Sequence, residues 1–143
     1  MAIYQTLTDS FKQQCLQAVQ NFGPTSPDTF KIALYTAAAS LGADTTVYST
    51  AEEVVGTGYT AGGVVLTISQ SPTVASNTAY VSFDNAQWLN ASFTARGALI
   101  YNSSKGNKSV AVLDFGADKT VSNKTFTVEM PGNTATEAII RIA

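Results

Sequence analysis

Two apolar runs, residues 93–102 and 109–116, stand on either side of a short polar gap and carry the strongest pattern in the chain. The gap is rich in Ser, Gly and Asn, which favour turns, so this stretch predicts a β-hairpin. A turn centred on residues 105–106 would place Tyr101 opposite Val110 and Leu99 opposite Val112.

In the same pairing a second set of apolar side chains falls on the opposite face of the hairpin. A strand with one face in water alternates apolar and polar residues, and this hairpin does not. Either another layer of this chain or a neighbouring copy therefore has to cover the second face. The second set consists of Ala98, Ile100, Leu113 and Phe115.

Five other short stretches have the alternation or the apolar content of β-strands, with turn-forming residues between them. Together with the hairpin they give about seven strands. This predicts a mainly β protein, an antiparallel β-sandwich or jelly roll. The five stretches are residues 30–36, 64–69, 78–83, 124–130 and 138–142.

One helix is expected, near the N-terminus. Apolar residues recur there at helical spacing, Thr8 or Asp9 can cap the start, and Gly23-Pro24 ends the pattern. We expect a single domain, with a helix or docking arm in residues 1–23 and the sandwich in residues 29–143. The helical apolar positions are Phe11, Cys15, Val19 and Phe22.

Three connections have expected forms of their own. Thr50 and Glu53 have the spacing of a capping box, which predicts one helical turn. Residues 84–90, which include Trp88, and residues 117–123 are expected to be loops.

The composition gives few clues to chemistry. The chain of 143 residues is 45% hydrophobic but only 13% charged, about half the usual charged share, so much of its surface has to be neutral. A net charge of -2 offers no basic surface for nucleic acid. No apolar run approaches the roughly 20 residues of a membrane-spanning helix. Residues 1–8 lack the features of a signal peptide, so synthesis in a cytoplasm without a cleavable signal is expected.

Side chains that carry catalysis are scarce. The chain has no histidine and a single cysteine, Cys15, which is better explained as a small core residue than as a nucleophile. The glycine-rich residues 56–63 lack the Gly-Lys-Ser/Thr ending of a phosphate-binding loop. No spacing selects a carboxylate pair such as Asp84 and Asp114 for hydrolysis. No enzymatic activity, cofactor or metal is expected.

Arg96 lies in the middle of a strand among apolar neighbours. A buried guanidinium has to be paired, because an uncompensated buried charge costs several kcal/mol. Its partner is expected to be Asp84, Asp118 or Glu129, or else a group on a neighbouring subunit. Because aromatic and Arg side chains anchor many interfaces, the candidate interface residues are Tyr4, Tyr59, Trp88, Arg96 and Tyr101.

Several blocks of sequence resemble a family of small virion proteins of tailed bacteriophages. They are Lys31-Ile32-Ala33-Leu34-Tyr35-Thr36, residues 56–63, residues 95–102, residues 111–119 and residues 138–142. The resemblance implies a virion structural protein without catalytic residues. Some members resemble capsid cement, or decoration, proteins, which sit on the outer shell as trimers and clamp adjoining capsomers.

The expected function is therefore that of a capsid cement protein, made in a bacterial cytoplasm and located on the virion surface. Its expected partners are copies of itself, as a homotrimer, and the major capsid protein. Two alternatives remain open. One is a tail, neck or fibre-attachment component of the virion. The other is a carbohydrate-binding module, in which Tyr59 and Trp88 would form an exposed stacking platform.

Overall fold

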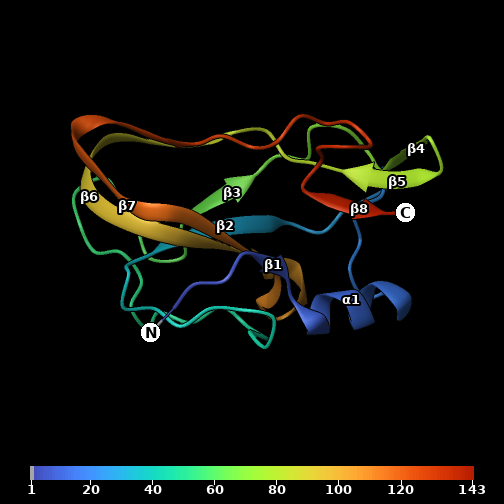
Figure 1. The fold of residues 1–143 in the computed structure, drawn as a ribbon, viewed down its shortest axis with the longest axis horizontal. Helices are drawn as coiled ribbons and strands as arrows, with labels where there is room; N and C mark the ends of the chain where they lie inside the picture. Colours follow the sequence, from blue (N-terminus) through green and yellow to red (C-terminus); the bar gives the residue numbers. More distant parts are fainter. Residues whose placement is uncertain (1) are drawn as a thin grey trace.

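The structure, a computed structural model, describes residues 2–143, so Met1 of the expected N-terminal segment lies outside the described residues. These residues form a mainly β protein with one short α-helix near its N-terminus (Figure 1). The elements are β1 (Thr6–Leu7), α1 (Asp9–Leu16), β2 (Phe30–Tyr35), β3 (Val64–Leu66), β4 (Thr73–Ala75), β5 (Thr78–Val81), β6 (Ala86–Asn102), the 3-10 helix η1 (Ser103–Lys105), β7 (Lys108–Val128) and β8 (Ile140–Ile142).

The strands form two antiparallel sheets, as the sequence predicted. The larger sheet has the order β1-β7-β6-β2-β3, and the smaller has the order β4-β5-β8. Of the two expected architectures, the β-sandwich describes this arrangement, because a jelly roll is built from two Greek-key motifs. β1 and β4 were not expected, since neither lies in a longer apolar or alternating run, unlike the equally short β3 and β8.

The hairpin of β6 and β7 is much longer than predicted, with strands of 17 and 21 residues. Residues 84–90 and 117–123 were expected to be loops, but most of them belong to these two strands. Near the middle Ala95 pairs with Lys119 and Gly97 pairs with Asp114, so residues 115–118 of β7 lie opposite Arg96 alone. This extra length on β7 lets the hairpin turn back on itself (Figure 1).

The bend divides the hairpin into two halves. The proximal half, residues 97–102 paired with 108–114, lies in the larger sheet beside β2. The distal half, residues 86–95 paired with 119–128, returns across one face of that sheet (Figure 1). The register of the proximal half confirms the pairing of Leu99 with Val112. Tyr101, however, pairs with Ser109 rather than Val110, because the ladder shifts between Ile100 and Tyr101.

Both faces of the proximal half are covered by this chain. On one face Ile100 belongs to the major core, which includes Phe30 and Ile32 of β2 and Phe93 and Phe126 of the distal half. On the other face is the minor core, formed by Ile3, Ala33, Tyr35, Ala39, Leu41, Leu99, Tyr101 and Val112. The second apolar face therefore needs no neighbouring subunit.

The helix is shorter than the predicted pattern. Thr8 caps it as expected, since its Oγ1 accepts a hydrogen bond from the Phe11 backbone N–H at 3.3 Å. It ends at Leu16, two residues before Ala18, which has a positive φ of 59°. Phe11 is buried against the strands, so α1 packs on its own chain and is not a detached arm. None of the described helices is long and apolar enough to cross a membrane.

Candidate functional site

Tyr4 and Arg96 are the two predicted interface residues that the structure brings together on the surface. Both line a surface pocket of about 310 Å³, which also contains Asp114. Tyr4 is 68% exposed, and its backbone N–H is fixed by a 2.9 Å hydrogen bond to the Leu41 carbonyl. An exposed aromatic ring beside a guanidinium suits recognition of a partner.

The partner of Arg96 within the chain is Asp114, not one of the three expected acids. Its Nε lies 3.4 Å from Asp114 Oδ1, and both side chains are about one-third exposed. The same oxygen accepts a 2.9 Å hydrogen bond from the Gly116 backbone N–H, while the Asp114 N–H donates to Gln5 Oε1. Arg96 pairs with Asp114 because the bend in the hairpin places Asp114 diagonally across from it on the neighbouring strand.

Three other predicted interface residues are not free on the surface. Trp88 and Tyr101 are only 3% and 2% exposed, and the Tyr101 hydroxyl donates to the Gly62 carbonyl at 2.7 Å. Tyr59 is half-buried, and its ring stacks near Trp88 with centroids 6.2 Å apart. Interface roles for Trp88 and Tyr101 are therefore incorrect for the folded chain, and Tyr59 and Trp88 form no exposed platform for a sugar.

Sequence reasoning missed the buried carboxylate of Glu53. The expected helical turn is instead a turn in which Glu52 has a positive φ of 62°. The Glu53 side chain points inward and accepts hydrogen bonds from Tyr48 Oη at 2.7 Å, Tyr59 Oη at 2.5 Å and the Gly62 N–H at 2.8 Å. No local pattern could have revealed this, because the donors become neighbours only on folding.

The tyrosines around Glu53 are perturbed by their surroundings. Burial, followed by the nearby Glu53 charge, raises the pKa of Tyr101 to about 12. Burial also raises the pKa values of Tyr35, Tyr48 and Tyr59, and Glu53 adds to the effect at each. Each of these hydroxyls donates a hydrogen bond, to Glu53 or to a backbone carbonyl. Glu53 and the four tyrosines therefore connect the 36–62 segment to the sheet.

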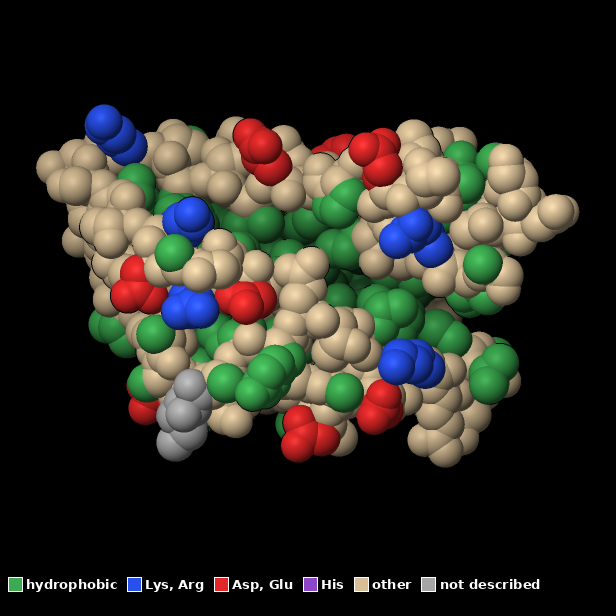
Figure 2. Space-filling model, in the orientation of Figure 1, with side chains coloured by type: hydrophobic (Ala, Val, Ile, Leu, Met, Phe, Trp, Pro, Cys, Tyr) green, Lys and Arg blue, Asp and Glu red, His purple; other side chains and the backbone are tan. Residues whose placement is uncertain are grey.

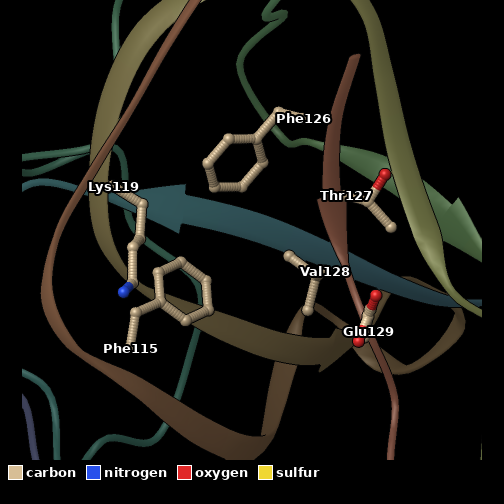
Figure 3. A pocket seen from close by; sticks show the side chains of 6 residues that line it. All are labelled: Phe115, Lys119, Phe126, Thr127, Val128 and Glu129. Carbon is tan, nitrogen blue, oxygen red and sulfur yellow. The ribbon is translucent and has the colours of Figure 1, made fainter.

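An apolar cleft lies beside the distal half of the hairpin, and we call it the β7 cleft. Its volume is about 320 Å³. Figure 3 shows the rings of Phe115 and Phe126 approaching each other across it, with centroids 6.2 Å apart. Figure 2 shows apolar side chains at the bottom of a hollow on this face of the molecule. The lining residues are Phe115, Lys119, Phe126, Thr127, Val128 and Glu129.

Among residues 2–143, no three Cys, Asp or Glu side chains gather as the ligands of a metal ion would. The β7 cleft offers apolar surface beside Lys119 and Glu129, and the surface pocket contains the Arg96–Asp114 ion pair. Comparison of the chain with protein-family models, curated proteins and solved structures found no match.

Proposed function

We propose that the chain is a non-enzymatic structural protein of a bacteriophage virion, acting as a capsid cement protein on the head shell. The observation that carries this proposal is the character of its surface. On the face drawn in Figure 2, charged side chains of both signs are scattered over a surface on which neutral groups predominate. Large apolar side chains are exposed on several separate elements: Tyr4, Leu16, Val47, Val55, Val65, Val74, Leu89 and Ile142.

Such a surface suits repeated contacts with neighbours in an assembly. Aliphatic groups gain free energy on leaving water, and neutral polar groups need only a hydrogen-bond partner, whereas buried charges have to be re-paired. The sequence blocks that resemble small virion proteins of tailed phages support the same assignment. Copies of this chain, as a homotrimer, and the major capsid protein would be its partners. Binding only to the assembled shell would stabilise that shell by mass action.

Tyr4 and Arg96 would act as anchors in this role, since they share an accessible pocket. Replacing both with Ala should lower the number of copies retained on virions while leaving the isolated chain folded, because Tyr4 is exposed and the Arg96–Asp114 pair is open to solvent on one side and contributes little to stability. Lys12→Ala on the exposed face of α1 is the matched control and should leave retention unchanged.

The direct test is the copy number and location of the chain in purified virions, from quantitative mass spectrometry and electron cryomicroscopy. Copies comparable in number with the capsomers, and density on the head surface, would support the cement role. A handful of copies confined to the tail or neck would overturn it in favour of a tail, neck or fibre-attachment component.

A further inference from the structure

The distal half of β7 has an open edge. Along one side β7 pairs with β6 over most of its length. Along the other side, within the described part of the chain, its strand partner is β1, which reaches only Ala111 and Val112. Residues 119–128 therefore present an unpaired strand edge, and such an edge is a template for another strand.

The register identifies the side chains that an added strand would meet. Residues paired across an antiparallel ladder share a face. The β6 partners along the distal half are the buried residues Ala95, Phe93, Ala91, Trp88 and Ala86. The corresponding row on β7, facing the same way, is Lys119, Val121, Lys124, Phe126 and Val128.

This row combines two cations with an apolar cleft. Phe126 and Val128 line the β7 cleft, and Lys119 stands at its other side beside Phe115 (Figure 3). Both Lys119 and Lys124 are exposed, although they lie on the face of β7 that is shared with the buried residues of β6. Long lysine side chains achieve this by laying their methylene groups on apolar surface and keeping the ammonium in water.

We propose that the open edge of β7 accepts an extended strand from a different protein, one that alternates acidic and apolar residues on the face it turns inward. Its carboxylates would lie opposite Lys119 and Lys124, and its apolar side chains would enter the cleft against Phe126 and Val128. Main-chain hydrogen bonds along the edge would supply affinity, and the row would supply specificity. Glu129 follows Val128 along the chain. It would lie opposite the end of the added strand that carries no acidic residue.

A second copy of this chain is the wrong occupant for this edge. The inward row of β7 carries two ammonium groups and no carboxylate, so pairing two copies would bring four like charges together. Lysines on an edge strand are a known means of preventing self-pairing. Charge complementarity therefore selects a partner strand that brings carboxylates.

In a virion the added strand would come from the major capsid protein or another shell protein. Only this choice of source rests on the proposed function. The preference of the β7 edge for an acidic and apolar strand would be the same in any assembly. A binding assay with purified chain and peptide tests it separately from the virion copy number, so either proposal can fail alone.

The probe is the peptide Val-Thr-Val-Thr-Glu-Ser-Val-Thr-Glu, laid antiparallel to residues 119–128. Trp88, the only tryptophan, contacts Phe126 with ring centroids 6.0 Å apart, so its fluorescence reports occupation of the cleft. We expect saturable binding that is at least tenfold weaker for the peptide with Lys in place of both Glu residues. Amide resonances of residues 119–128 should shift.

The Lys119→Glu/Lys124→Glu variant should reverse the preference between the two peptides, and Lys12→Glu on α1 should leave it unchanged. Circular dichroism checks that each variant is folded. Equal binding of both peptides, no binding at millimolar peptide, or shifts confined to residues outside β7 would overturn the proposal. Self-association through this edge, seen as shifts of the 119–128 amide resonances with protein concentration in the absence of peptide, would also overturn it, because a second copy would then occupy the edge.

Discussion

Glu53 shows how a single buried residue can hold two parts of a β-sandwich together. Glu53 is 7% exposed and makes no ion pair with any described residue, so neutral donors compensate its carboxylate for the loss of water. Tyr59 extends the connection, because its hydroxyl donates to Glu53 and accepts from the Leu34 backbone N–H at 2.9 Å. The long segment before β3 is thereby fixed to β2.

Glu53→Ala should destabilise the chain by about 3 kcal/mol, because it leaves one buried and two half-buried donors without their acceptor. Glu53→Gln should cost less, since its amide oxygen can still accept. The free energy of unfolding from urea denaturation measures both. Glu52→Ala, at the exposed neighbouring residue, should change stability by less than about 0.5 kcal/mol. Equal effects at the two positions would contradict the structural role of Glu53.

The tyrosines near Glu53 predict a loss of stability at alkaline pH. Unfolded tyrosines ionise near pH 10, whereas Tyr101 in the folded chain has a pKa of about 12. The folded state thus keeps a proton that the unfolded state loses. This contribution is fully present below pH 10 and is lost as the pH rises through 12. The free energy of unfolding should fall steadily over this interval, and less steeply in Tyr101→Phe; an unchanged slope in that variant would exclude Tyr101.

At this scale, sequence reasoning succeeded where the determinant is local. Thr8 was identified as a helix cap because capping depends on residues three positions apart. The aromatic residues were harder to assign to the core or to an interface, since an aromatic side chain suits both. The buried face of the distal strand is nevertheless visible in the alternation of Ala86 and Trp88, and again in that of Ala91, Phe93 and Ala95, and this signal could have placed Trp88 inside.

At the scale of elements, the bend of the long hairpin decides the fold. It is made by four residues of β7 standing opposite one residue of β6, close to two glycines. A Cβ at Gly97 would lie 2.6 Å from the Leu113 carbonyl oxygen, so the strands approach too closely there for any side chain. Gly116 has open space around it but a positive φ of 80°.

The two glycines should therefore differ in their tolerance of alanine. Gly97→Ala should cost about 3 kcal/mol, because the backbone of β6 has to move away from β7. Gly116→Ala should cost about 1 kcal/mol, the price of a positive φ for a residue with a side chain. Chemical denaturation of the two variants measures the difference. A larger loss at Gly116 would show that conformation, and not close approach, governs the bend.

The sequence could not predict this bend for a physical reason. A polar stretch such as residues 117–123 has the composition of a loop, and its pairing with β6 is visible only when the opposite strand is known. The same holds for the partner of Arg96, since Asp114 comes within reach only because the bend displaces residues 115–118. Strands such as β2 were predicted well because the alternation within their own sequence is sufficient to identify them.

At the scale of the whole molecule, the unusual property is a hairpin buried on both faces within one chain. The N-terminal residues and the 36–53 segment cover the second apolar face of the proximal half. The sequence alone left open whether a neighbouring copy covers that face. Leu99 and Ile100 are adjacent in sequence and fully buried, but Leu99 belongs to the minor core and Ile100 to the major core. The pair therefore allows the two cores to be tested separately.

We expect Leu99→Ala and Ile100→Ala each to destabilise the chain by about 3 kcal/mol, because each leaves a cavity in a closed core. The losses should be the same at every protein concentration, including dilutions at which any oligomer dissociates, since both cores are complete in one copy. Leu89→Ala, at a side chain that is 64% exposed, is the control and should change little. If Leu99→Ala cost much less than Ile100→Ala, or only at concentrations that support an oligomer, the minor core would need a neighbour to complete it. The interfaces proposed here would then have to include that face as well as the edge of β7.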